Sequence, residues 1–196
     1  MTAALGPREV DALQELASVG CGQALTALGR LANRRFDMDV PEAWIGSTPG
    51  AIASFLGGLG EDLVAVGVKL EGALQGDLLL ALPERDAERL AALLGWPAPG
   101  GDFGPLAESA LLESGNIVGS AFVSAVAALV HRKLLLSVPA FARGNGRRCV
   151  EALVAHAGAI AVATRFTCDG GALEGLILVM PEPGRIAALL SGLDLG

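Results

Sequence analysis

The sequence predicts an α+β fold in which two long helices pack on an antiparallel sheet and the whole arrangement is repeated once. Hydrophobic residues make up 52% of the 196 residues and aromatic residues only 4%, so Ala, Val and Leu must fill the core. Two stretches with helical periodicity each begin at a Gly-Pro pair, and short apolar runs between glycine-rich turns follow each of them. A chain of this length can bury one substantial core.

The repeat is visible as matching residues at a constant separation along the chain. Pairs separated by 98 positions are Gly6 and Gly104, Pro7 and Pro105, Glu15 and Glu113, Pro41 and Pro139, and Pro83 and Pro181. The halves are about 1–98 and 99–196, with no linker-like composition between them. We therefore expect a single domain of two repeats, related by a pseudo-two-fold axis.

The same order of elements is expected in each half. Proline suits the first turn of the opening helix, which needs no amide donor there, and the second long helix is expected from about residue 105 to 133. Short helices should close the halves at residues 84–95 and 183–192. Strands are expected at residues 42–46, 63–70, 77–82, 140–144, 150–157, 160–166 and 176–180, and a solvated hairpin turn at residues 143–148.

Each long helix has a polar stripe opposite an apolar one when its residues are placed at 100° intervals. In the second helix the apolar stripe is Leu111, Val118, Phe122, Ala125 and Leu129, and the polar stripe is Ser109, Glu113, Asn116, Ser120, Ser124 and His131. In the first helix Asp11, Glu15, Ser18, Gly22 and Thr26 lie opposite Leu13, Gly20, Ala24 and Leu31. The glycines at 20 and 22 are expected to allow close packing.

The plainest interpretation of these polar stripes is that they are the solvated sides of amphipathic helices. Small residues surround Glu113 and Asn116, however, in place of the Lys, Arg and Glu that usually cover such a side. Another protein surface could therefore approach closely. Asparagine is also a poor helix former and costs a few tenths of a kcal/mol in mid-helix. Both features favour a binding face.

The pattern Asp/Ser, three residues, Glu, two residues, Asn, twenty-two residues, Pro occurs twice. In the second half it is Ser109, Glu113, Asn116 and Pro139; in the first half it is Asp11, Glu15, Ser18 and Pro41, with serine in place of asparagine. This resembles the signature of the CheC–CheX–FliY family of chemotaxis phosphatases, over essentially the whole chain. The resemblance implies dephosphorylation of the response regulator CheY, with Glu113 and Asn116 as the catalytic pair.

The same resemblance implies that this chain and the regulator each supply part of the catalytic site. The phosphorylated regulator would supply Mg²⁺ and a lysine, so this chain would need no cofactor or metal of its own. Asn116 would orient the attacking water and Glu113 would anchor the helix, because phosphoryl transfer depends on positioning and charge neutralisation. Ser18 cannot present a planar amide, so Glu15 and Ser18 would form a degenerate second site with weak or no hydrolysis.

Composition limits the other classes of function. A net charge of -7 argues against non-specific nucleic-acid binding, which uses many cationic contacts. Cys21, Cys149 and Cys168 form no CxxC pair, and the two histidines are not spaced as metal ligands. The longest apolar run has 14 residues, fewer than the roughly 20 that span a bilayer, and the start lacks signal-peptide features. A cytoplasmic protein without a membrane partner is expected.

A non-catalytic adaptor is the alternative. The family resemblance supplies the receptor deamidase CheD as a possible partner for such a duplicated scaffold, and the two roles can coexist. The intact Glu113–Asn116 pair favours the enzyme, whereas the serine at position 18 shows that the chain tolerates losing half of the chemistry.

Overall fold

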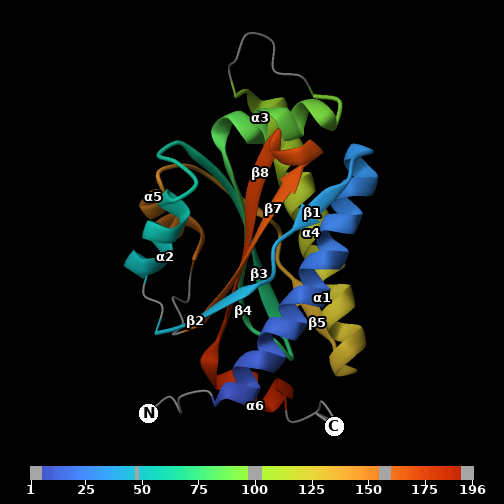
Figure 1. Cartoon of the computed structure of the whole chain (residues 1–196), viewed down its shortest axis with the longest axis vertical. Helices are drawn as coiled ribbons and strands as arrows, with labels where there is room; N and C mark the ends of the chain where they lie inside the picture. Colours follow the sequence, from blue (N-terminus) through green and yellow to red (C-terminus); the bar gives the residue numbers. More distant parts are fainter. Residues whose placement is uncertain (1–5, 47–48, 97–102, 155–159, 191–196) are drawn as a thin grey trace.

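The computed structural model describes residues 6–46, 49–96, 103–154 and 160–190 (Figure 1). The first half contains α1 (Pro7–Ala32), β1 (Phe36–Met38), β2 (Glu42–Ile45), α2 (Pro49–Gly57), β3 (Leu63–Gly72), β4 (Gly76–Pro83) and α3 (Glu84–Leu93). The second contains α4 (Pro105–Val130), β5 (Leu134–Leu136), β6 (Ala140–Gly144), α5 (Gly146–Leu153), β7 (Ile160–Cys168), η2 (Asp169–Gly171), β8 (Leu173–Pro181) and α6 (Pro183–Leu190). Apart from η2, the order of elements in the first half is repeated in the second.

One antiparallel sheet joins the two halves. Its strand order is β1-β7-β8-β4-β3-β5, with β2 also paired to β7 and β6 also paired to β3. The short strands of each half therefore lie on the long strand of the other half. At the centre, Leu79 pairs with Leu178 and Leu80 with Ile177. A shift of 98 positions converts one pair into the other, which confirms the predicted pseudo-two-fold arrangement between β4 and β8.

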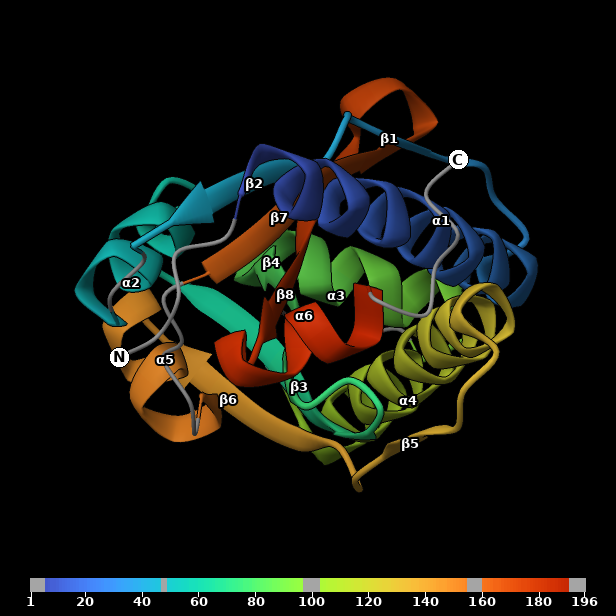
Figure 2. The ribbon, with the colours of Figure 1, turned by 90° about the horizontal axis from the view of Figure 1, so that it is seen from below.

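The sheet is covered on both faces. α1 and α4 pack side by side on one face, and α2 and α5 pack on the other, as Figures 1 and 2 show. Alternating residues of the long strands serve the two layers: Val64, Val66 and Val68 belong to the core under the long helices, whereas Leu63 and Ala65 belong to the core under α2 and α5. The α+β class and the long helices on the sheet are confirmed; the α2–α5 layer was not predicted.

The contact between α1 and α4 depends on a glycine. A methyl group at Gly20 would lie 2.5 Å from two carbons of the Phe122 ring, so only glycine lets the two helices approach this closely. Gly22, two positions later, has much more room, since a methyl group there would meet only the Met38 sulfur at 3.9 Å. The predicted close packing is confirmed for Gly20 alone.

This difference gives a stability prediction with an internal control. We expect Gly20→Ala to lower the free energy of unfolding by about 1–3 kcal/mol, because the added methyl overpacks the helix interface. Gly22→Ala should leave this free energy unchanged or raise it by up to about 1 kcal/mol, because alanine is the better helix former. Urea denaturation of both variants measures the difference; equal midpoints would contradict the packing described for Gly20.

Several local predictions are wrong. Residues 150–157 do not begin a strand: the segment up to Leu153 completes α5, and residues 155–159 lie outside the described ranges. The expected hairpin turn at 143–148 contains the start of this helix, where the Asn145 side chain accepts a hydrogen bond from the Arg148 amide at 3.0 Å. Leu31 and Leu129, assigned to the packing stripes, are 44% and 39% exposed because they occupy the last helical turns.

By length and composition alone, α4 could cross a membrane. In the structure it is a helix of the protein core, with Leu111, Val118 and Phe122 buried against α1 and the sheet.

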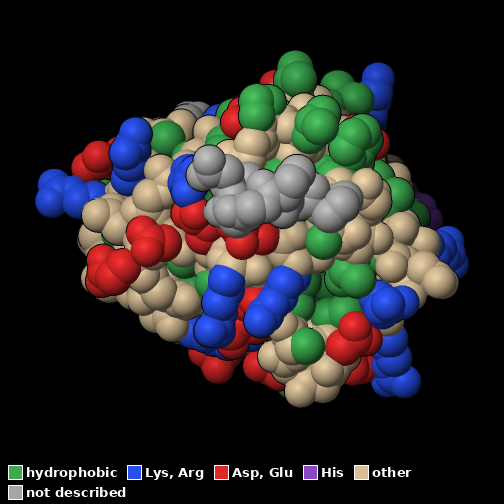
Figure 3. Space-filling view, turned by 90° about the horizontal axis from the view of Figure 1, so that it is seen from above, with side chains coloured by type: hydrophobic (Ala, Val, Ile, Leu, Met, Phe, Trp, Pro, Cys, Tyr) green, Lys and Arg blue, Asp and Glu red, His purple; other side chains and the backbone are tan. Residues whose placement is uncertain are grey.

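At the end of the molecule that carries α3, acidic and basic side chains are interspersed (Figure 3). The buried Asp86 carboxylate accepts a hydrogen bond from Arg89 there at 2.8 Å.

Candidate active site

The predicted site residues of the second half share the exposed side of α4. Ser109, Glu113 and Ser120 are exposed, and Asn116 is half-buried. The helix begins at Pro105 after the extended N-cap Gly104, and it runs without interruption to Val130. Because the stripe lies in the middle of a regular helix, the carboxylate and the carboxamide are held one turn apart on the same side.

Tight packing of the opposite side fixes the rotation of α4. A side chain at Gly115 would overlap Val66, and one at Gly119 would approach Val68 and Leu136 at 3.1 and 3.2 Å. The buried Ser114 hydroxyl donates to the carbonyl of Ala110 at 2.9 Å and so is satisfied within the helix. These contacts leave no room for the helix to turn and bury the Glu113–Asn116 side.

Within the described ranges, neither Glu113 nor Asn116 has a hydrogen-bond or ion-pair partner in the protein. Their polar atoms are therefore available to another molecule. The half-buried state of Asn116 restricts its side chain more than that of a fully exposed residue, whereas Glu113 projects into solvent. A carboxylate and a carboxamide one turn apart on a helix surface can orient a partner's groups through hydrogen bonds and charge.

The first half places its counterparts in the same way. Asp11 and Glu15 are exposed on α1 and Ser18 is half-buried, matching Ser109, Glu113 and Asn116 in their exposure. The two stripes are therefore equivalent in position and differ in chemistry, because Ser18 offers a short hydroxyl where the second half has an amide.

The two signature prolines lie where the chain passes beside these helices. The Gln14 side-chain amide donates to the carbonyl of the buried Pro41 at 3.0 Å, which ties this segment to α1 one turn before Ser18. Pro139, half-buried, occupies the corresponding position between β5 and β6. Pro41 therefore lies against α1, although it is far from that helix in the sequence.

The three cysteines of the chain are free and buried. Burial raises the pKa of the Cys21 thiol to about 12, and it also raises the pKa values of Cys149 and Cys168, so the protonated thiol is favoured at all three positions. In the part of the chain that the structure describes, no group of three or more His, Cys, Asp or Glu is placed to hold a metal ion.

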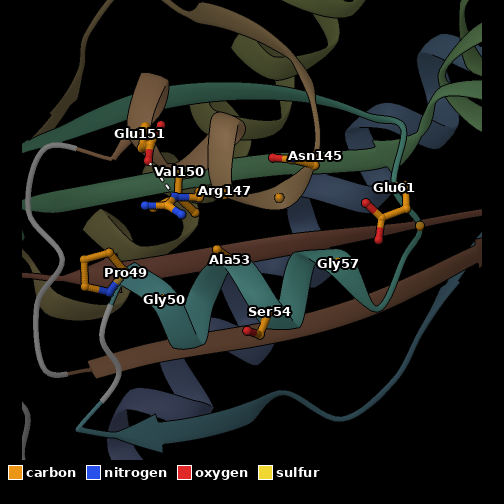
Figure 4. Close-up of a pocket in the computed structure, with 12 residues that line it drawn as sticks. Pro49, Gly50, Ala53, Ser54, Gly57, Glu61, Asn145, Arg147, Val150 and Glu151 are labelled. Carbon is orange, nitrogen blue, oxygen red and sulfur yellow. Dashed lines mark hydrogen bonds and ion pairs between the residues drawn. The ribbon is translucent and has the colours of Figure 1, made fainter.

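A cleft between α2 and α5 has a volume of about 790 Å³ (Figure 4). It lies across the sheet from α4, and none of the predicted site residues lines it. Its Arg147 side chain pairs with Glu151 at 2.9 Å, as the dashed line in Figure 4 marks. The cleft therefore does not contribute to the site on α4.

Sequence reasoning missed a pair of exposed apolar side chains next to the prolines. Val40 is 83% exposed and Val138 is 86% exposed, more than the other large hydrophobic residues of the described ranges. The available signal was the recurrence of Val-Pro at the same position in both halves.

No family model matches the chain. Over 137 residues it is 33% identical to the CheY-P phosphatase CheC of Bacillus subtilis, a match that covers 67% of this chain and 64% of the length of that protein. Among solved structures, Thermotoga maritima FliY has a TM-score of 0.71 at 15% identity and 96% coverage of both chains. Borrelia burgdorferi CheX, in a complex with CheY, BeF3 and Mg²⁺, has a TM-score of 0.60 at 19% identity, covering 86% of this chain and 99% of that one.

The fold is thus the one shared by CheX and FliY, and also by the middle domain of Helicobacter pylori FliM, with a TM-score of 0.66 at 10% identity, covering 96% of this chain and 100% of that one. At these identities the structural likeness establishes the fold alone. Together with the Bacillus CheC match, it shows that the chain belongs to the CheC–CheX–FliY family.

Proposed function

We propose that this protein hydrolyses the aspartyl phosphate of phosphorylated CheY, with the Glu113–Asn116 side of α4 entering the regulator's phosphorylation site. The observation that carries the proposal is the availability of these two side chains: they share one exposed side of a helix whose other side packs closely on the sheet, and neither side chain has a partner within the described ranges. Fold alone could not support an activity, because the same fold can serve different functions.

The proposed step is attack of a water molecule on phosphorus. The bond between phosphorus and the aspartyl oxygen breaks, the regulator recovers its aspartate carboxylate, and inorganic phosphate leaves. Asn116 orients the water through its amide, because a neutral amide cannot act as a general base at pH 7. Placing the water in line for attack is the main contribution that such a helper protein can make to phosphoryl transfer.

Glu113 has a docking role in this scheme. One turn before Asn116 on the exposed side, its carboxylate can pair with the lysine of the regulator's phosphorylation site. The regulator's own Mg²⁺ neutralises charge on the phosphoryl group. Glu113 therefore fixes how deeply α4 enters the regulator's site. At that depth the Asn116 amide lies where it can orient the attacking water.

The decisive experiment mixes the protein with phosphorylated CheY and Mg²⁺ and follows release of phosphate. Faster decay than that of CheY alone supports the phosphatase. Binding with unchanged decay would support the alternative, a non-catalytic adaptor, and CheD could then be tested as its partner by the same binding measurement. The serine at position 18 favours this alternative, because one of the two helix faces has kept its glutamate without the asparagine.

The equivalence of the two helix faces gives a gain-of-function prediction. Ser18→Asn should restore a complete Glu–Asn pair on α1 and raise the phosphatase rate, up to about twofold if both faces then act alike, since the number of competent sites doubles. In a chain that also carries Asn116→Ala, the same change should restore activity. A double variant as inactive as Asn116→Ala alone would show that α1 lacks more than its amide.

A further inference from the structure

Two large apolar side chains are exposed on α4 and on the segment that follows it. Leu106 is 63% exposed and precedes Glu113 by two helical turns on the same side of α4. Val138, 86% exposed, belongs to the segment between β5 and β6. Keeping large apolar side chains in water is unfavourable, and docking of a partner that covers them removes this cost.

Contacts on either side of Val138 place its segment alongside the middle of α4. Leu136, two residues before it, packs at Gly119 of α4. Phe141, three residues after it, pairs with Val66, and Val66 in turn packs against Gly115. The chain between Leu136 and Phe141 therefore runs alongside the stretch of α4 that contains Asn116.

The first half differs at one of these two positions. Position 8, which corresponds to Leu106, is an exposed arginine, whereas Val40 corresponds to Val138 and is equally exposed. The apolar pair is thus complete only beside the helix that has the intact Glu–Asn pair. This asymmetry links the apolar side chains to the competent face rather than to the fold, which both halves share.

We propose that Leu106 and Val138 form an apolar docking rim that contacts phosphorylated CheY on either side of the inserted Glu113–Asn116 pair. The inference rests on the proposed function and extends it from chemistry to recognition. The rim supplies affinity and not catalysis: burying a valine or leucine side chain on docking stabilises the complex, while the attacking water is oriented by Asn116.

The test uses single substitutions that leave the core untouched. Val138→Ser and Leu106→Arg, the latter introducing the residue of the first half, should each raise KM for phosphorylated CheY about tenfold or more with kcat retained, because an apolar contact has been removed from the interface. Val40→Ser is the matched control, and it should leave both constants unchanged.

A binding measurement separates this inference from the proposed function. Calorimetric titration with CheY charged with BeF3 and Mg²⁺ should show weaker binding for Val138→Ser and unchanged binding for Asn116→Ala. Wild-type affinity and KM in both rim variants would overturn the docking rim even if Asn116→Ala abolishes hydrolysis. Weakened binding by a protein that hydrolyses nothing would instead retain the rim and reject the phosphatase.

Discussion

Asn116→Ala should abolish nearly all phosphatase activity, lowering kcat by about a hundredfold or more while KM for phosphorylated CheY stays close to that of the wild type. The amide orients the water, and loss of correct positioning in a reaction that depends on it costs a factor of this size. Because Asn116 is half-buried and its side chain makes no hydrogen bond within the described ranges, truncating that side chain should not weaken the fold.

Ser18→Ala is the control for this result. It alters the equivalent position on α1 and should leave kcat within about twofold of the wild type, because a serine there presents no amide. Single-turnover decay of phosphorylated CheY distinguishes the two variants. If Asn116→Ala retained most of the activity, another residue would have to orient the water, and the proposed mechanism would be wrong.

Glu113→Gln should impair the enzyme in a different kinetic constant. The substitution keeps the size of the side chain and removes the charge that is proposed to pair with the regulator's lysine, so KM should rise by about ten- to hundredfold. The expected contrast with Asn116→Ala, which lowers kcat, is the signature of separate docking and orienting roles.

High ionic strength provides an independent check on Glu113. If its carboxylate pairs with a lysine, added salt should raise KM of the wild type more than that of Glu113→Gln, because salt screens the attraction only where the charge is present. The same salt dependence in both proteins would contradict the pairing and leave Glu113 as an ordinary surface residue.

The features that could be predicted from sequence are those that repeat along the chain. The 98-residue offset revealed the duplication, and helical periodicity placed Glu113 and Asn116 on the outer side of α4. Their catalytic roles stay predictions, because exposure and freedom from partners are necessary for the proposed chemistry without being a measurement of it.

Features that depend on long-range contacts could not be predicted. The segment ending at Leu153 contains valine and alternating apolar residues, which favour a strand, but Cys149, Val150 and Leu153 form one buried helical side against the sheet. The Asn145 cap was the local signal for this helix. The position of the Val138 segment alongside α4 depends on the packing of Leu136 at Gly119 and on the pairing of β6 with β3, which no local pattern encodes.

The exchange of short strands between β3 and β7 has a consequence for how the two copies can diverge. β1 and β2, which follow α1, hydrogen-bond to β7, and β5 and β6, which follow α4, hydrogen-bond to β3. Neither copy is modular, so the first cannot be deleted once its own chemistry is lost. The first copy is then retained because its strands support the fold of the second copy. A surface residue such as Ser18 can change in the course of evolution while the backbone around it is kept.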